Sequence, residues 1–340
     1  MPIIKYRMEA YIKAISVYLP SKVLSNEDLV NEFPEWTIDK IASKVGIKQR
    51  HIADENEFVS DMAIKAAEKL FEEQHIEKSS IDFILLCTQS PDYFLPTTAC
   101  LVQKKLGLST SCGAIDFNQG CSGYIYGLSL AKGLILGGIA KNILLITSET
   151  YSKFIHPQDK GNRTIFGDAA TASIISNNGV LKIKDFELGT NGDGADNLIV
   201  KNGASRNPVK NGITLNDEFG NVISEDHLYM NGSEIFNFTL QAVPSLVHST
   251  LEKNNLQLED VNFFVFHQAN KYMLNHLRKK IGIPTEKFVI EMENYGNTVS
   301  STIPIVLNYM LRESKFSNNE KILLAGFGVG YSWGGVVVES

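Results

Sequence analysis

Cys121 has the surroundings of a nucleophile. It lies between a short apolar run, Cys112–Ile115, which predicts a buried strand, and a long apolar segment, Tyr124–Leu136, which predicts a helix. Gly120 and Gly123 would let a substrate approach closely. A thiol at a helix N-terminus faces the positive end of the helix dipole, which favours the thiolate. The pattern indicates a nucleophilic cysteine, and a buried core cysteine is the alternative.

Two other residues could act with this thiol. His267 directly follows the apolar run Asn262–Phe266, and ligands in α/β proteins bind at the carboxyl ends of such strands. Asn297 lies in the segment Asn294–Thr298, which matches the segment around Cys121 position by position. A thiol nucleophile, an imidazole and an amide donor could therefore converge on one crevice. The alternative for His267 is a hydrogen-bonded histidine of the core or its rim.

The glycine-rich segment Gly326–Gly334 follows a predicted strand, so a dinucleotide-binding loop has to be considered. The segment lacks the third glycine at the required spacing, and it continues into Gly335–Val338, which predicts a strand rather than a helix. We therefore reject a dinucleotide site. A loop that offers backbone N–H groups to an oxyanion fits better.

The elements that must position these residues occur twice. Three pairs of apolar blocks follow the same order in the two halves of the chain: Asp82–Leu86 with Asn262–Phe266, Gly113–Phe117 with Lys287–Met292, and Asn142–Ile146 with Lys321–Ala325. An internal duplication of an α/β unit explains this order. It would place Asn297 at a helix N-terminus facing Cys121.

The remaining pattern is that of alternating strands and helices. Strands are expected over residues 10–19, 82–88, 142–147 and 170–175, and helices over 35–44, 96–106 and 233–253. Ser25–Asp28 predicts a capped helix start, and Ser60 predicts the cap of an amphipathic helix. Residues 181–227 are rich in Asn, Asp and Gly, which indicates loops and short strands over one end of the molecule.

Composition excludes several classes of function. A net charge of −6 gives no general attraction for nucleic acid or an anionic membrane. The four cysteines lack paired CxxC spacing, which argues against a disulfide framework and a zinc site and suits a reducing cytoplasm. Met1–Lys13 lacks the apolar core of a signal peptide, and no run reaches the roughly 18 apolar residues of a membrane span. We expect a soluble, cytoplasmic protein.

Taken together, the motifs resemble those of a thiolase-superfamily condensing enzyme, most closely the β-ketoacyl-acyl-carrier-protein synthase III family. The resemblance covers almost the whole chain. It rests on the following segments: Gly46-Ile47 with Arg50-His51, Gly120–Gly123 around Cys121, Phe166–Ala169, His267–Asn270, Asn294–Thr298 and Gly328–Gly334.

The resemblance implies an α/β, thiolase-like fold with two pseudo-symmetric βαβαβαββ halves in a five-layered αβαβα arrangement. Residues 1–180 would form the half with the nucleophile, and residues 181–340 the half with His267 and Asn297. The family is usually homodimeric. No metal or other cofactor is expected.

The resemblance also implies a reaction. Cys121 would take the acyl group from an acyl-CoA, and His267 and Asn297 would bind the thioester carbonyl of a malonyl-acyl-carrier protein as it loses CO₂. The resulting carbanion would attack the acyl-Cys121 carbonyl. The backbone N–H groups of Cys121 and Val329 would hold the oxyanion.

Residues for substrate binding carry over in the same way. The resemblance assigns CoA or pantetheine to Trp36, Lys44, Lys160, Phe236 and Asn270, and it assigns to Leu95 the role of shaping the acyl pocket of a dimer partner. Simple packing is the alternative for Trp36.

The chain departs from the family at three of these positions. Lys44 and Lys160 stand where the family has arginines, and lysine lacks the planar fork of arginine. Val329 replaces a glycine. An acyltransferase with a small-molecule acceptor and a non-catalytic partner subunit therefore stay open as alternatives, although the chain keeps every reactive group.

Overall fold

The computed structural model describes residues 9–217, 220–315 and 317–340, so the first eight residues of the amino-terminal segment considered above lie outside the described part. The core is a ten-stranded sheet with the order β14-β13-β15-β16-β8-β1-β7-β6-β4-β5. Its strands are β1 (Tyr11–Tyr18), β4 (Phe83–Cys87), β5 (Gly113–Phe117), β6 (Asn142–Glu149), β7 (Ala169–Ser176), β8 (Leu181–Thr190), β13 (Phe263–Phe266), β14 (Phe288–Val289), β15 (Lys321–Gly328) and β16 (Ser332–Glu339).

The two halves of this sheet have the same design. From the outer edge inward, one half runs β5-β4-β6-β7-β1 and the other runs β14-β13-β15-β16-β8. In each half the outer three strands are parallel and the inner neighbours pair antiparallel. The halves join where β1 pairs with β8, over only two residue pairs, Tyr11↔Lys182 and Ile12↔Leu181. The predicted thiolase-like fold with two pseudo-symmetric halves is confirmed.

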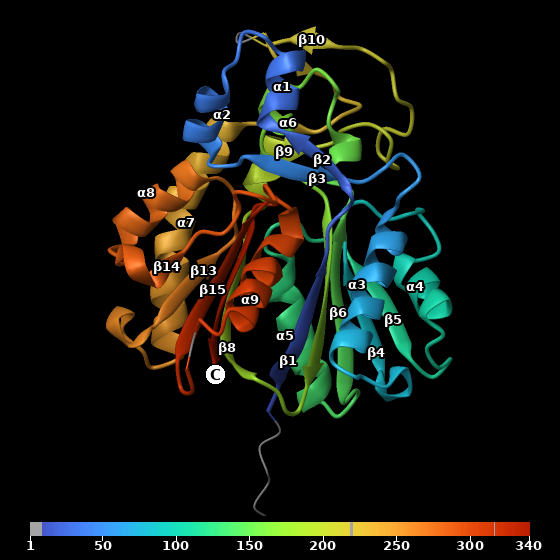
Figure 1. Ribbon diagram of the computed structural model, residues 1–340, viewed down its shortest axis with the longest axis vertical. Coiled ribbons are helices and arrows are strands. Elements are labelled where there is room, and N and C mark those ends of the chain that lie inside the picture. The colour runs from blue at the N-terminus through green and yellow to red at the C-terminus, as the bar shows by residue number, and fades with distance from the viewer. Residues whose placement is uncertain (1–8, 218–219, 316) are drawn as a thin grey trace, which may run out of the picture.

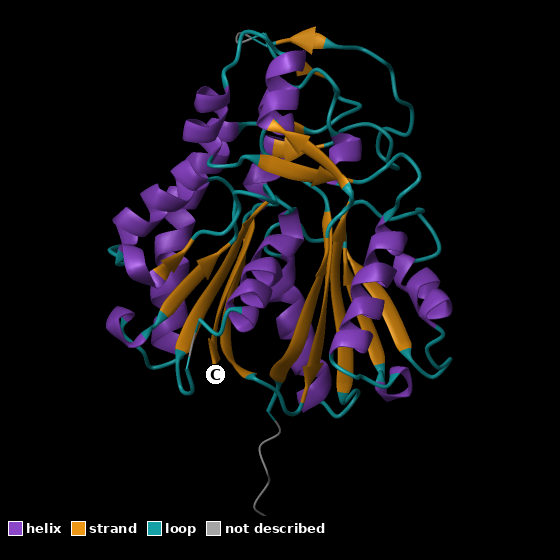
Figure 2. Ribbon diagram, viewed as in Figure 1, coloured by secondary structure: helices purple, strands orange, loops and turns teal. Residues whose placement is uncertain are grey.

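Helices form three layers around the two halves (Figures 1 and 2). The middle layer, α5 (Gly123–Leu136) and α9 (Thr302–Arg312), contacts strands of both halves. On the outer faces, α3 (Val59–Glu73) and α4 (Thr98–Leu106) cover the first half, whereas α7 (Gly232–Lys253) covers the second and packs against α8 (Lys271–Ile281). The result is the expected αβαβα stack, and each interface buries its own apolar cluster.

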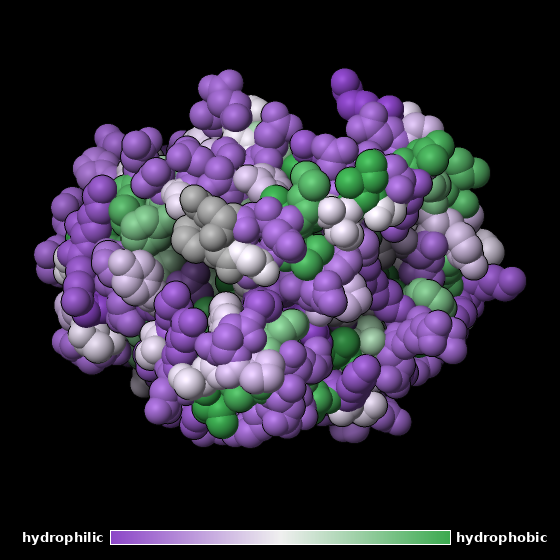
Figure 3. Space-filling model, turned by 90° about the horizontal axis from the view of Figure 1, so that it is seen from above, coloured by the Kyte–Doolittle hydropathy of each residue, from purple (hydrophilic) through white to green (hydrophobic). Residues whose placement is uncertain are grey.

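The remaining elements form a cap over one end of the sheet, made of residues 22–52, 151–163 and 191–231. It contains the following short elements: β2 (Lys22–Ser25), α1 (Asn26–Glu32), α2 (Ile38–Val45), β3 (Gln49–Ile52), α6 (Lys160–Arg163), β9 (Leu198–Ile199), β10 (Leu215–Asn216), β11 (Val222–Ile223) and β12 (Tyr229–Met230). Figure 3 looks onto this end, where hydrophilic side chains dominate and hydrophobic ones form separate patches.

Local signals in the sequence account for several element ends. Ser25 accepts from the backbone N–H of Asp28 in a capping box at the start of α1, as predicted. The predicted cap at Ser60 is wrong: α3 already begins at Val59 after Phe58, and the Asp61 carboxylate accepts from the Phe58 N–H. The Asp61 carboxylate, rather than the Ser60 hydroxyl, therefore accepts from a backbone N–H at the start of this helix.

Two other expectations need correction. The strand before Cys121 was expected to be buried, yet β5 is an edge strand and Ile115 is 43% exposed. Residues 181–227 were expected to form loops and short strands, yet β8 spans ten residues near the centre of the sheet. Its lysines alternate with apolar residues, and Lys182 and Lys184 pair with Glu9 and Glu339. The alternation of lysines with apolar residues is the two-residue period of a strand with one polar face, not the composition of a loop.

Within the described residues, no helix is long and apolar enough to cross a membrane.

Candidate active site

Cys121 occupies the turn between β5 and α5, as predicted. The thiol is buried, with 6% of the residue exposed, and the glycine-rich turn of the second half packs against it. A Cβ atom on Gly328 would lie 2.8 Å from Cys121 Cβ and 3.0 Å from Sγ. Only glycine at position 328 leaves room for the nucleophile in this position.

The electrostatics of Cys121 differ from the expectation. Burial, and next the charge of Glu149, raise the pKa of the thiol to about 12, while the backbone N–H groups of Cys121 itself and of Val329 lower it. The helix N-terminus alone therefore does not make Cys121 a thiolate in the free protein, because desolvation outweighs the dipole. The two N–H groups that act on the sulfur are the two predicted to hold an oxyanion.

His267 follows β13, and its environment keeps the imidazole neutral. The residue is 1% exposed, and its backbone N–H donates to the carbonyl of Ala325. Burial lowers the pKa of His267 to about 3, against a hydrogen bond with the backbone of Val299. Nδ1 lies 2.8 Å from the Thr302 hydroxyl. The same hydroxyl lies 3.2 Å from the Val299 carbonyl, so it can donate to that oxygen or to Nδ1. When it donates to Nδ1, the imidazole proton is on Nε2, which is then a hydrogen-bond donor for a substrate.

Asn297 is held on three sides. Its backbone N–H donates to the Ile165 carbonyl, its carbonyl accepts from the Gly167 N–H, and its side-chain Oδ1 accepts from the Val299 N–H at 2.9 Å. With Oδ1 occupied in this way, the NH₂ group of the amide is the part left to donate. Val299 has a φ of 56°, which is rare for a β-branched residue and concentrates at functional sites. The helix expected to begin at Asn297 begins five residues later, at Thr302, because a 3₁₀ turn, η6 (Val299–Ser301), precedes α9.

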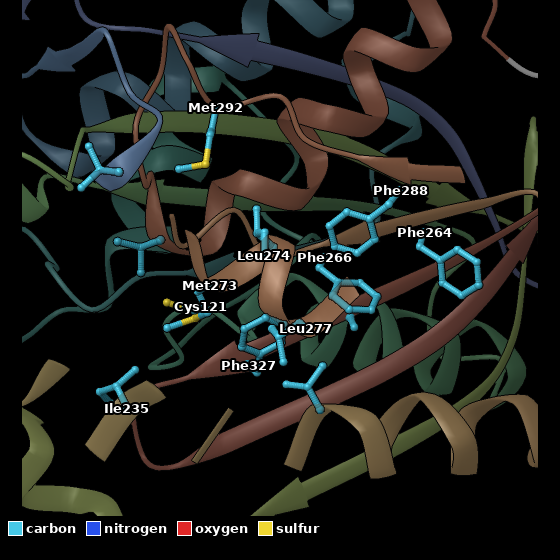
Figure 4. Close-up of a cluster of buried hydrophobic side chains, with 14 of the residues drawn as sticks. Cys121, Ile235, Phe264, Phe266, Met273, Leu274, Leu277, Phe288, Met292 and Phe327 are labelled. Atoms are coloured by element: carbon cyan, nitrogen blue, oxygen red, sulfur yellow. The ribbon is translucent and has the colours of Figure 1, made fainter. Parts of the chain in front are cut away.

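Contacts between the turns bring the three predicted catalytic residues together. Gly326 lies against the backbone of Cys121 and Ser122, and the next residue, Phe327, has its ring centroid 5.8 Å from that of His267. Ser300, three residues after Asn297, lies beside Gly123 at the start of α5. Figure 4 shows Cys121 near Phe327 and Met273, among side chains from several elements. A buried thiol therefore shares one small region with a neutral imidazole and an oriented amide.

The residues assigned to CoA border the cap. Trp36 is half-buried, with the Lys40 ammonium 5.0 Å from its ring centroid, and the Phe236 ring packs near Tyr272 and His276. Lys44 is exposed in the last turn of α2.

Two of the assigned side chains already have partners. Lys160 forms an ion pair with Glu35. Asn270 caps α8 by accepting from the Met273 N–H.

Leu95 is much more exposed than a residue that lines a pocket within one chain would be. It is 82% exposed in the loop after β4, next to Phe94, which is 85% exposed. Both belong to the same side of the sheet as the edge strand β5, since α4, which follows this loop, packs against β5.

The structure adds residues that the sequence reasoning missed. Gly328, Thr302 and Glu149 touch or orient the predicted catalytic residues, as described above. A signal existed for Glu149, which ends a strand at the same edge of the sheet as His267, but the predicted strand stopped two residues short of it. Among the described residues, no group of three or more His, Cys, Asp or Glu could hold a metal ion.

Comparison with known proteins supports the resemblance to the condensing enzymes. Residues 115–206 match the family described as 3-oxoacyl-[acyl-carrier-protein (ACP)] synthase III, and residues 251–340 match its C-terminal family. A β-ketoacyl-[acyl-carrier-protein] synthase III from Clostridium perfringens is 37% identical over 327 residues, which cover 95% of this chain and 97% of the relative. The corresponding enzyme from Sulfurimonas denitrificans is 36% identical over 97% of each chain.

Solved structures agree with these relatives. A 3-oxoacyl-(acyl-carrier-protein) synthase III crystal structure has a TM-score of 0.95 at 46% identity, covering 98% of this chain and all of the other. A 3-oxoacyl-(acyl-carrier protein) synthase from Burkholderia xenovorans has a TM-score of 0.87 at 36% identity, with coverages of 97% and 94%. The chain belongs to the β-ketoacyl-acyl-carrier-protein synthase III family.

Proposed function

We propose that this protein catalyses a decarboxylative Claisen condensation between an acyl-CoA primer and malonyl-acyl-carrier protein, and that Cys121, His267 and Asn297 carry the reaction. The observation that supports this most directly is the shared location of a buried thiol, a neutral imidazole and an oriented amide at the meeting point of the two halves. The relatives named above carry the name of this activity.

The first step is acyl transfer to the enzyme. The Cys121 sulfur attacks the thioester carbonyl of the acyl-CoA, and the tetrahedral oxyanion accepts from the N–H groups of Cys121 and Val329. The carbonyl re-forms as the CoA thiolate leaves with the proton given up by Cys121. One oxyanion donor typically contributes about 3–4 kcal/mol to transition-state stability. Because Val329 donates through its backbone, its side chain matters less than the course of the turn.

The second step breaks the bond between the malonyl carboxylate and its α-carbon. CO₂ leaves, and the electron pair passes into an enolate of the carrier-protein thioester. Nε2–H of His267 and the NH₂ group of Asn297 donate to the enolate oxygen. Both donors are neutral, and their hydrogen bonds strengthen as negative charge develops on the oxygen in the transition state, which is what catalysis requires.

The third step forms the new carbon–carbon bond. The enolate α-carbon attacks the acyl-Cys121 carbonyl, the same two N–H groups hold the oxyanion, and the Cys121 sulfur leaves as the β-ketoacyl product forms. The Cys121 thiolate takes up one proton from water, and the enzyme is ready for another acyl group. Negative charge therefore develops in all three steps: on an oxyanion held by the N–H groups of Cys121 and Val329 in the first and third, and on an enolate held by His267 and Asn297 in the second.

The cap would bind the CoA part of the primer. Trp36 and Phe236 offer apolar rings at its border, and Lys44 is exposed to meet a phosphate. Lys160 would have to exchange Glu35 for a phosphate, and Asn270 would donate its NH₂ while its oxygen caps α8. The pairing of Lys160 with Glu35 predicts weaker CoA binding than a free arginine fork would give.

A homodimer would complete the acyl side of the site. The edge strand β5 and the exposed Phe94 and Leu95 offer an unpaired strand and an apolar loop on the same side, which a second copy could cover. Leu95 would then enter the partner's acyl pocket. Sedimentation of the wild type against Phe94→Glu tests this, and a monomeric wild type would contradict it.

The division of labour follows the halves. Residues 1–180 would supply the nucleophile, and residues 181–340 the histidine and asparagine.

The four cysteines are all free in the structure, which suits a reducing cytoplasm.

The test is an intact-protein mass measurement after mixing with a panel of acyl-CoA thioesters, followed by malonyl-acyl-carrier protein. We expect the gain of one acyl group in the wild type and in Cys112→Ala, none in Cys121→Ala, and discharge with release of CO₂. An acyl-enzyme that ignores malonyl-acyl-carrier protein but reacts with a small alcohol or amine would point to the alternative acyltransferase. A protein that no acyl-CoA or acyl-carrier protein acylates would contradict the proposal.

A further inference from the structure

The carboxyl group of Glu149 is buried completely at the end of β6. All of its hydrogen-bond partners are neutral. The Gln89 backbone N–H donates to both oxygens at 3.1 Å, Ser90 Oγ donates to Oε2 at 3.0 Å, and Ser300 Oγ donates to Oε1 at 3.2 Å. Burying a carboxylate among neutral groups is costly, so this arrangement calls for an explanation.

The partners of Glu149 belong to the two turns that carry the chemistry. Gln89 reaches the turn of Cys121, because its Nε2 donates to Asn118 Oδ1 and its Oε1 lies 2.7 Å from where a Cβ of Gly120 would be. Ser300 belongs to η6, the 3₁₀ turn directly after Asn297. Glu149 therefore links the support of the nucleophile to the support of the amide donor, and it comes from neither turn itself.

Glu149 also acts on its surroundings through charge. Its ionised form raises the pKa of the Cys121 thiol, of the Cys87 thiol at the end of β4, and of the Tyr151 phenol in the following 3₁₀ turn. On its other side Asp168, just before β7, raises the pKa of Glu149 itself. Every titratable group named here is acidic, so ionisation of Glu149 opposes ionisation of Cys121.

We propose that Glu149 is a positioning residue that aligns the Cys121 and Asn297 turns and that its ionisation opposes formation of the Cys121 thiolate. This inference rests on the proposed role of Cys121 as nucleophile. It predicts a specific pH dependence, because the carboxyl and the thiol compete to lose a proton. While Glu149 is neutral, the thiolate fraction rises tenfold per pH unit; once Glu149 is ionised, the rise is suppressed.

Burial supports a transition in an accessible pH range. It raises the pKa of Glu149 to about 8, against the donors from Gln89, Ser90 and Ser300. Glu149 is therefore protonated at neutral pH, where condensation must run. Gln at this position keeps the shape and the neutral charge at every pH.

The experiment measures the rate at which iodoacetamide alkylates Cys121, by peptide mass, from pH 6 to pH 10. We expect the wild-type rate to rise tenfold per unit at first and to flatten above pH 8, whereas Glu149→Gln keeps rising. At pH 6.5 the two rates should agree within about twofold, and at pH 9.5 the variant should react about tenfold faster or more. Superimposable profiles would overturn the proposal.

A matched control separates this effect from general loosening of the fold. Asp168 is another completely buried carboxyl, with a pKa raised to about 6 by burial, but it bonds to Ser152 and Ala53 instead of the catalytic turns. Asp168→Asn removes a charge that raises the pKa of Glu149, so its profile should still flatten, but from a lower pH than in the wild type. If Glu149→Gln fails to fold, the wild-type profile alone decides, since a straight rise through pH 8 contradicts the proposal. Alkylation needs no acyl donor, so failure of the proposed condensation would leave this readout intact.

Discussion

The two halves of the sheet share one design but differ at the positions that carry chemistry. In the first half Phe83 pairs with Ile143, and in the second half Phe263 pairs with Ile322. Phe83 is therefore equivalent to Phe263 in the repeat, and Ile143 to Ile322. Counting along these strands places Cys87 opposite His267 and Glu149 opposite Gly328 in the repeat. The aligned turns place Cys121 opposite Asn297. Each half therefore presents three equivalent positions at the same edge, filled by different residues.

The difference separates acidic groups from neutral ones. The first half has two thiols and a carboxyl at these positions, all of which become negative when they lose a proton. The second half has an imidazole kept neutral, an amide and a glycine. In the proposed reaction, the negative charge of the nucleophile would thus arise on one half, while the donors for the enolate would come from the other. The duplication supplies the frame, and the divergence supplies the charge difference that catalysis needs.

The strongest test of this comparison substitutes the two thiols. Cys121→Ala should abolish acylation by any acyl-CoA, because the variant lacks the proposed nucleophile. Cys87→Ala should keep acylation within about tenfold, since the Cys87 thiol has hydrogen bonds with the Gln119 carbonyl and the Ser300 side chain rather than a role in the reaction. Mass spectrometry of the acyl-enzyme gives the answer. Acylation on Cys87 in the Cys121→Ala variant would show that the halves are chemically interchangeable.

A smaller but still large effect is expected at the contact between the halves. Gly328→Ala would place a methyl group 2.8 Å from Cys121 Cβ, so the nucleophile must move, and acylation should slow about a hundredfold. Gly133→Ala is the matched control, because it lies in α5 with open space around its Cβ position. The control should retain full activity and be slightly more stable by thermal unfolding. Equal rates for the two variants would contradict the close approach.

Hydrogen-bond donation by His267 can be weakened without substituting His267 or Asn297. Thr302→Val removes the hydroxyl that faces His267 Nδ1 and frees the imidazole to take either tautomer. We expect condensation to slow roughly tenfold, the value of one lost hydrogen bond, while Cys121 acylation is unchanged. Single-turnover measurements of each step separate the two. Slower acylation would mean that Thr302 supports both halves.

The smallest effect concerns stability against pH. His267 has a folded pKa of about 3, below the ordinary value of 6.5, so below pH 6.5 the unfolded chain binds a proton that the folded protein refuses. His267 alone should therefore lower the unfolding free energy by up to about 1.4 kcal/mol per pH unit below that point, against the opposite contribution of Glu149, whose pKa is raised in the folded protein. His267→Gln should remove this slope in urea titrations at pH 7, 6 and 5. An unchanged slope would mean that the buried imidazole is protonated in the folded protein.

The sequence predicts the frame of this site well, because apolar runs and turns are local signals. The three residues predicted to be catalytic were selected by their place after predicted strands, and the repeat located Asn297. What failed depends on distant neighbours. The protonation state of Cys121 depends on burial, which a helix N-terminus does not reveal, and the exposure of β5 depends on its place at a sheet edge. Glu149 was missed because a carboxylate at the end of a strand reads as the start of a loop.

The way the halves are fastened has a mechanical consequence. They meet at the narrow β1–β8 seam, and near the catalytic turns the segment around Phe166 pairs with Asn297 in an isolated bridge. Both of these pairings connect the two halves, so the halves cannot move apart without breaking one of them. Main-chain hydrogen bonds therefore hold the Asn297 turn of the second half directly against the segment around Phe166 in the first half.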